Sequence, residues 1–385
     1  MPSEPAIPLR VLLAGARGKQ PSLLDLARRL ILAESPSGEK SALDACVALA
    51  ATHAAALGAR VRLHRQRASG NTLEARFGPR SRSAAPVLLL GHLDTVWPLG
   101  TLTAMPCRVA NGRLFGPGAL DMKAGVAMAF TALEMLAEAG VLDREIVLFL
   151  NTDEEIGSPA SRPLIERLAA SSSAVYVLEP GQGLACKTAR KGTGRWRIQV
   201  RGVAAHAGVD FAAGASALRE VARIIETVSG WTGLRPGLTI NVGLAGGGSR
   251  PNVVPAEAWA EVDVRIARAS DGPRIARKFA ALRPADPRCT LTVTGAIERP
   301  PMERTRGTVR LYRRARALAS GLGFTLDEAS TGGASDGNFA SALGIPTLDG
   351  LGAVGEGAHA AHESVEIDHL APRTALLAAL FATRE

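Results

Sequence analysis

The sequence predicts an α/β protein: a discontinuous domain with a mostly parallel sheet covered by helices, and a smaller inserted α+β domain with an antiparallel sheet. In the first half of the chain, strand patterns alternate with long helical patterns, which is typical of a parallel sheet. Near residue 190 the strands begin to alternate apolar and polar residues, as half-exposed antiparallel strands do. The first pattern returns near residue 300. We therefore expect one domain over 1–188 and 299–385 and an inserted domain over 189–298.

The individual elements follow from apolar spacing. Helical spacing runs over 22–35, 41–58 and 123–140, and Gly58 and Gly140 stand where a helix-ending glycine is favoured. Short apolar runs predict strands at 60–65, 72–77, 86–91, 145–152 and 174–179. The inserted domain has strand patterns at 195–202, 238–247 and 258–267, with helices near 214–229 and 272–282. A helix near 307–320, a strand at 345–349 and a last helix from Asp368 complete the larger domain.

Composition excludes several classes of protein. Hydrophobic residues make up 46% of the chain, enough for a sizeable core. The net charge of +9 invites a nucleic-acid interpretation, but the basic residues are dispersed and only 4% of residues are aromatic, so we expect no nucleic-acid partner. No apolar run reaches a membrane span or a signal-peptide core, and the four cysteines are scattered. We expect a cytoplasmic protein with reduced thiols and no membrane partner.

Polar residues gather at the carboxyl ends of the predicted strands, where an α/β sheet usually opens onto its ligand. Any one of them has an ordinary explanation as a cap, a loop residue or a structural histidine. Five such sites are harder to explain in this way, because clustered acids at the ends of buried strands would repel and desolvate one another unless cations neutralised them. The sites are His92 with Asp94, Asp121 in a glycine-rich turn, the acids Asp153, Glu154 and Glu155, then Glu179, and finally His359 with His362.

Two histidines with several carboxylates suit zinc or a similar divalent ion, and the carboxylates suffice for two ions with one Asp bridging. Asp94, two residues after His92, fits an acid that orients a ligand imidazole and fixes its tautomer.

The motifs "GHLDTV", "GPGALDMKAG", "NTDEEIGS", "LEPG", "AAHAG" and "GEGAHAAHES" occur in an order that resembles the di-zinc exopeptidase family of carboxypeptidase G, aminoacylase, acetylornithine deacetylase and succinyl-diaminopimelate desuccinylase. The stretch 188–208 is most similar to the carboxypeptidase G branch. The resemblance implies two Zn²⁺ per subunit, with Co²⁺ or Mn²⁺ as possible substitutes. It implies His92 and Glu179 on one ion, Glu155 and His359 on the other, Asp121 as the bridge, and Glu154 as the general base on the shared water.

Two positions refine what the resemblance implies about the histidine ligand and the substrate class. His359 lies four residues before Glu363, as the ligand of the family lies before a Glu, so it is favoured over His362. In members of the family that it resembles and that cleave carbamoyl or ureido groups, the position of Glu179 looks like His. The resemblance therefore implies that a Glu here favours peptide or acyl-amide substrates. The resemblance also implies a cis peptide bond after Asp121.

The inserted domain supplies further candidates. The resemblance implies that His206 stabilises the oxyanion in the active site of a partner subunit, which predicts a homodimer and a dimerisation role for this domain. It places Asn252 and Arg265, and less directly Arg299, against the carboxylate or carbonyl of the substrate.

The expected function is therefore hydrolysis of an amide bond next to a free α-carboxylate, in a small peptide or an N-acyl amino acid. A glutamate carboxypeptidase comes first and an N-acyl-amino-acid deacylase second, because the same metal centre serves both. A non-catalytic binding relative is the third alternative, although neither Glu154 nor any ligand position is lost.

Overall fold

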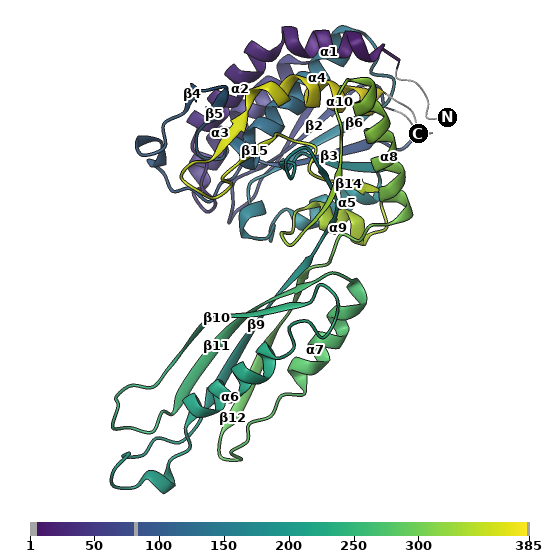
Figure 1. Ribbon diagram of the computed structural model, residues 1–385. Helices are drawn as coiled ribbons and strands as arrows, with labels where there is room; N and C mark the ends of the chain where they lie inside the picture. Colours follow the sequence, from purple (N-terminus) through teal and green to yellow (C-terminus); the bar gives the residue numbers. More distant parts are fainter. Residues whose placement is uncertain (1–5, 81–83, 383–385) are drawn as a thin grey trace. The chain divides into compact units, whose positions relative to one another are not determined.

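The computed structural model of the protein describes residues 6–80 and 84–382 (Figure 1). These residues form two compact units. The first comprises the chain up to Ala189, Arg304–Ser330 and the chain from Ser335 onwards; the second comprises Arg190–Glu303 and Thr331–Ala334. The predicted fold class is confirmed: the first unit holds a mostly parallel sheet with helices, and the second an antiparallel sheet.

The central sheet of the first unit has the strand order β1-β2-β6-β3-β7-β14. The strands β6, β3, β7 and β14 are parallel, whereas β1 and β2 join antiparallel at one edge. The strands span Arg60–His64 (β1), Thr72–Phe77 (β2), Val87–His92 (β3), Ile146–Asn151 (β6), Ala174–Val177 (β7) and Thr347–Leu348 (β14).

Both faces of this sheet are buried, which explains why its strands are apolar without alternation. In β3, Val87 and Leu89 face one core and Leu88 and Leu90 face the other. Six helices contribute to the first core, namely α1 (Leu9–Gly18), α2 (Gln20–Leu32), α3 (Lys40–Ala56), α4 (Ala124–Glu138), α8 (Arg306–Gly321) and α10 (Leu370–Ala382). On the other face lie α5 (Arg162–Ala170) and α9 (Gly337–Ala342) (Figure 1).

Two small sheets complete the first unit. One has the order β15-β16-β5-β4, and the other pairs β13 with β8. Their strands are β4 (Arg108–Ala110), β5 (Arg113–Phe115), β8 (Cys186–Arg190), β13 (Glu328–Thr331), β15 (Gly355–Glu356) and β16 (Ser364–Glu366). The sequence pattern did not predict these strands, nor α1, α5 and α9. The missed strands lack the unbroken apolar runs of β3, β6 and β7.

The second unit is a four-stranded antiparallel sheet with the order β10-β11-β9-β12. One face packs against α6 (Ala217–Ser229) and α7 (Gly272–Ala280), and alternate residues such as Trp196, Ile198 and Val200 fill the core between them. The intervening positions of β9 carry charged or polar side chains, namely Arg195, Arg197, Gln199 and Arg201, as the alternating pattern predicted. The strands are β9 (Gly192–Arg201), β10 (Thr239–Gly247), β11 (Glu257–Ile266) and β12 (Thr290–Arg299), the last of which the sequence pattern missed.

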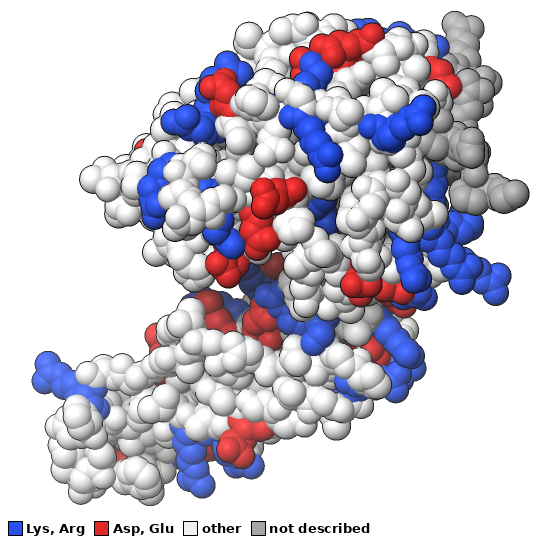
Figure 2. Space-filling view, turned by 45° about the horizontal axis from the view of Figure 1, so that its top comes forward, with Lys and Arg blue, Asp and Glu red and all other residues white. Residues whose placement is uncertain are grey.

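Charged residues of both signs are interspersed on the face shown in Figure 2, so the net charge of +9 does not form one continuous basic surface there. None of the helices in the described part of the chain combines the length and apolar character that a membrane crossing requires. The four cysteines are free thiols, three of them buried.

Candidate metal centre

The sheet topology brings three of the predicted sites to one edge. The strands β6, β3 and β7 are neighbours and parallel, so their carboxyl ends meet. His92 is the last residue of β3 and pairs with Asn151 of β6. Glu154 and Glu155 follow β6 in a short 3₁₀ turn, and Glu179 comes two residues after β7.

Two loops complete the centre. Asp121 lies in an irregular turn between Gly118, at φ +69°, and the start of α4. The peptide bond from Asp121 to Met122 is cis, as the resemblance implied. His359 lies in the loop between β15 and β16 and has a φ of +61°.

The imidazoles and carboxylates converge around Asp121. Its Oδ1 lies 3.2 Å from His92 Nε2, and its Oδ2 lies 3.5 Å from His359 Nε2. Glu179 Oε1 is 3.7 Å from His92 Nε2, and Glu155 Oε1 is 3.2 Å from His359 Nε2. Each oxygen of Asp121 therefore faces a different histidine, and each histidine has a second carboxylate of its own.

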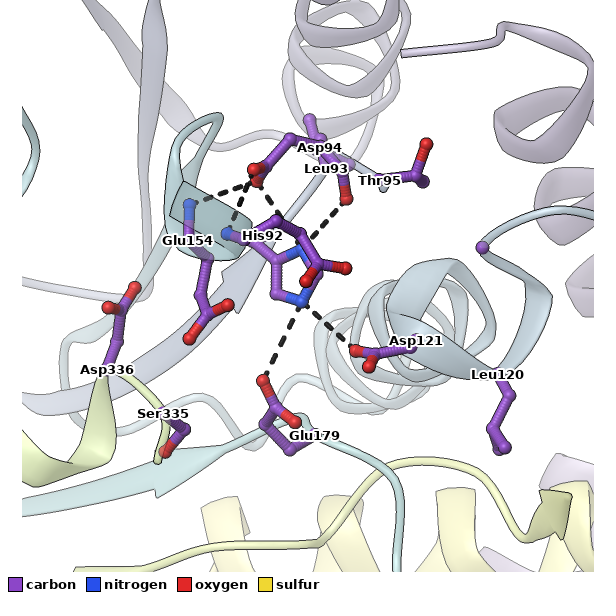
Figure 3. Close-up of polar contacts among 12 residues, drawn as sticks. His92, Leu93, Asp94, Thr95, Leu120, Asp121, Glu154, Glu179, Ser335 and Asp336 are labelled. Carbon is purple, nitrogen blue, oxygen red and sulfur yellow. Dashed lines mark hydrogen bonds and ion pairs between the residues drawn. The ribbon is translucent and has the colours of Figure 1, made fainter. Parts of the chain in front are cut away.

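These spacings fit metal ligands. Two atoms about 2.1 Å from one tetrahedral zinc ion lie about 3.4 Å apart, and the contacts above span 3.2 to 3.7 Å. Figure 3 shows Asp121, Glu154 and Glu179 directed toward the His92 imidazole. Ligand atoms of His92, Glu154 and Glu179 lie within 4.8 Å of one another, as do those of His92, Asp121 and Glu155. The donor set suits zinc or another divalent ion.

The histidines and carboxylates of the centre shift one another's pKa values. Burial by itself would lower the pKa of His92, but hydrogen bonds and charges from Asp121 and Asp94 raise it well above its ordinary value. Hydrogen bonds to Asp121 and Glu155 raise the pKa of His359 to about 10. Burial opposes ionisation of Asp121, yet the two histidines hold its pKa below the usual range. The centre is therefore built to hold positive charge between its carboxylates.

Asp94 has a different set of partners from the one expected. The nearest partner of His92 Nδ1 is the backbone carbonyl of Asp94 at 3.0 Å, whereas the Asp94 carboxylate is 3.5 Å away. That carboxylate accepts the backbone N–H of Glu154 at 3.2 Å and of Glu155 at 3.1 Å, and the Ser37 hydroxyl at 2.8 Å. Asp94 thus fixes the tautomer of His92 mainly through its backbone and holds the Glu154–Glu155 turn through its side chain.

Asp153 does not join the metal centre, although it is the first of three consecutive acids. Its carboxylate accepts the backbone N–H groups of Ala160 and Ser161 and the Ser161 hydroxyl, just before α5. Burial raises the pKa of Asp153 despite these bonds. The sequence signal that could have separated Asp153 from its neighbours is the Ser161 that precedes the helix.

In the second unit, two segments place His206 and Asn252 near each other. The Ala207 N–H donates to the Asn252 carbonyl at 3.0 Å, and His206 forms a bridge with Val253. The exposed His206 accepts the N–H groups of Gly208 and Val209 at Nδ1, at 3.2 and 3.1 Å. A neutral His206 therefore carries its proton on Nε2, where it can donate to a ligand.

The two arginines of this unit have different surroundings. Arg265, on β11, binds the Asp263 carboxylate through Nε and Nη2 at 2.7 and 3.0 Å, while its Nη1 lies 3.5 Å from the Gly332 carbonyl. Arg299 is buried at the end of β12, where it pairs in register with Thr193.

Comparison with known proteins finds a carboxypeptidase and a desuccinylase among the relatives of this chain. The chain is 30% identical over 378 residues to carboxypeptidase G2 from Pseudomonas sp., covering 96% of this chain and 90% of that protein. It is 28% identical over 313 residues to a succinyl-diaminopimelate desuccinylase from Cereibacter sphaeroides, covering 74% and 80% of the two chains.

Solved structures share the fold. The aminopeptidase PepT from Bacillus cereus superimposes with a TM-score of 0.81 at 23% identity, covering 94% of this chain and 98% of that one. A dinuclear metal-binding peptidase from Bacillus subtilis superimposes with a TM-score of 0.68 at 14% identity, covering 95% of this chain and 98% of that one. The model of peptidase family M20/M25/M40 matches residues 88–383, which include all five candidate ligands. The chain belongs to this family of metal-dependent peptidases and amidohydrolases.

Proposed function

We propose that this chain is a zinc-dependent hydrolase that cleaves an amide bond next to a free α-carboxylate, as a glutamate carboxypeptidase does. The observation that carries the proposal is that the two oxygens of Asp121 each face a different histidine. The similarity to carboxypeptidase G2 over nearly the whole chain supports placing carboxypeptidase activity before deacylase activity. Deacylation of N-acyl amino acids is the second candidate, because relatives that remove succinyl and acetyl groups match as well.

In this proposal, His92 and Glu179 would hold one Zn²⁺ and Glu155 and His359 the other, and the Asp121 carboxylate would serve both ions. Co²⁺ or Mn²⁺ would substitute. When bound, the two ions would acidify a water and polarise the scissile carbonyl. Glu154 takes a proton from the attacking water and passes it to the leaving nitrogen, and its carboxylate lies within 4.8 Å of the ligand atoms of His92 and Glu179.

The candidate substrate-binding residues belong to the second unit. His206 donates its Nε2–H to the developing oxyanion, which is consistent with the two N–H groups that Nδ1 accepts. Asn252 and Arg299 bind the substrate, with Arg265 opposite its carboxylate. Because Asp263 already holds Nε and Nη2 of Arg265, the carboxylate approaches from the Nη1 edge.

The test is metal-dependent hydrolysis of N-acyl-glutamates, other N-acyl amino acids and short peptides. Glu154→Gln is expected to reduce kcat by about 10² to 10⁴-fold with both ions retained. The matched control is Glu166→Gln, the same change in a partly exposed residue of α5 that pairs with Arg162 and is not part of the metal centre, and it should leave kcat unchanged. A wild-type chain that binds two ions and hydrolyses none of these substrates would refute the proposal and favour a ureido substrate or a binding role.

We also propose a cytoplasmic homodimer in which His206 acts on the site of the partner. This arrangement has a sharp test, because mixing His206→Ala with Glu154→Gln chains would create one intact site per hybrid dimer. Random exchange would then restore about one quarter of the wild-type activity. No restoration in verified hybrid dimers would show that His206 acts within its own chain.

A further inference from the structure

Glu363 connects the two loops that carry metal ligands. It follows His359 by four residues and directly precedes β16. Its side chain is 1% exposed and lies beneath the turn that contains Asp121. A hydrogen bond stabilises the backbone between His359 and Glu363, because the Glu363 N–H donates to the Ala360 carbonyl at 2.9 Å.

The Glu363 carboxylate accepts four hydrogen bonds. Oε1 accepts the backbone N–H groups of Leu120 at 2.9 Å and Asp121 at 3.1 Å. Oε2 accepts the backbone N–H of Gly118 at 3.0 Å and the indole N–H of Trp97 at 2.9 Å. Two donors on each oxygen use the acceptor capacity of an ionised carboxylate in full.

The turn requires such an acceptor. Gly116 and Gly118 have φ values of +151° and +69°, and a Cβ on Gly118 would lie 2.4 Å from Thr95 Cγ2. This left-handed path directs the amides of Gly118, Leu120 and Asp121 inward, away from water. Buried N–H groups without an acceptor are costly, so this path of the turn depends on the acceptor oxygens beneath it.

The consequence reaches the metal centre through Asp121. Its backbone N–H is bound by Glu363, while its two carboxylate oxygens face His92 and His359. We propose that Glu363 is a positioning residue, which holds Asp121 in the bridging orientation and ties it to the His359 loop so that both metal ions bind. This inference rests on the proposed two-metal function.

The test is Co²⁺ binding to metal-free Glu363→Gln, measured by competition with a chelator. In whichever orientation the new amide lies, its NH₂ group would face two N–H donors in place of an acceptor. We expect the Co²⁺ affinity to fall by about 10- to 100-fold, as for other residues that support metal ligands. The magnetic coupling between the two Co²⁺ ions should weaken as well, which a loss of stability alone would not produce.

The matched control is Glu74→Gln, the same change in another buried glutamate of this unit, which lies on β2 and is bound by His64 of β1 and Arg76 of β2. Its Co²⁺ affinity should equal that of the wild type. Folding of each metal-free variant is checked by its unfolding midpoint. If Glu363→Gln does not fold, Trp97→Phe, which removes one donor and keeps the carboxylate, should still weaken Co²⁺ binding measurably.

Wild-type Co²⁺ affinity and coupling in a folded Glu363→Gln chain, or in Trp97→Phe where that variant is needed, would overturn the inference. The outcome is separate from the proposed function, because it involves no substrate. A wild-type chain that binds two Co²⁺ ions but hydrolyses nothing would refute the function and leave this experiment valid.

Discussion

Replacing Asp94 by Asn tests whether its carboxylate positions the Glu154–Glu155 turn. The change keeps the size of the side chain but substitutes an NH₂ group for one acceptor oxygen. Oδ1 accepts the Glu154 N–H and Oδ2 accepts the Glu155 N–H, so either orientation of Asn leaves one backbone N–H facing a donor. The cost of such an N–H is about 1–3 kcal/mol. If the unpaired N–H is that of Glu155 and destabilises the position of this ligand, metal binding weakens by about 5- to 150-fold.

The assay is Co²⁺ affinity of the metal-free chain by chelator competition, with kcat measured at saturating metal. Ser37→Ala is the control, because it removes the 2.8 Å hydroxyl contact with Asp94 but leaves both backbone N–H groups their acceptor. Its effect should be smaller. The tautomer of His92 should persist in Asp94→Asn, since the nearest partner of Nδ1 is a backbone carbonyl. Unchanged affinity and unchanged kcat in Asp94→Asn would refute the reasoning.

Two further predictions concern other parts of the molecule. His206→Ala should lower kcat by about 10² to 10³-fold with the metal content unchanged, because it removes an oxyanion donor and no ligand; a fall in metal content by mass spectrometry would contradict this role. Burial opposes ionisation of Glu74, but hydrogen bonds from Arg76 and His64 outweigh it and hold its pKa below the ordinary 4.5. The ionised Glu74 carboxylate therefore stabilises the folded state above pH 4.5, and this stabilisation is lost as the pH falls through the lower pKa that Glu74 has in the folded state. Urea unfolding should show that the difference between wild type and Glu74→Gln shrinks below about pH 4.5, and a difference independent of pH would be evidence against it.

Much of the fold could be predicted from local patterns. The wholly apolar runs at β3, β6 and β7 indicated strands buried on both faces, and the change to alternation near residue 190 indicated the antiparallel sheet of the second unit. These signals are local, because burial on one face leaves an alternation of apolar and polar residues and burial on both faces leaves an unbroken apolar run. Short elements such as β15 and α9 left no such pattern, since contacts with distant segments stabilise them.

The residue types of the site, the strand ends at which they stand and the resemblance to a metal-dependent hydrolase family can be read from the sequence, and the family match confirmed the resemblance. The partners of each side chain become known from the folded arrangement. Asp153 and Glu154 are neighbours in the chain, yet Asp153 binds the start of α5 and Glu154 lies beside His92. Glu363 meets the amide of Asp121 across 242 positions of sequence. Such contacts depend on the register of the sheet and on the direction of each side chain, and neither leaves a trace in local spacing.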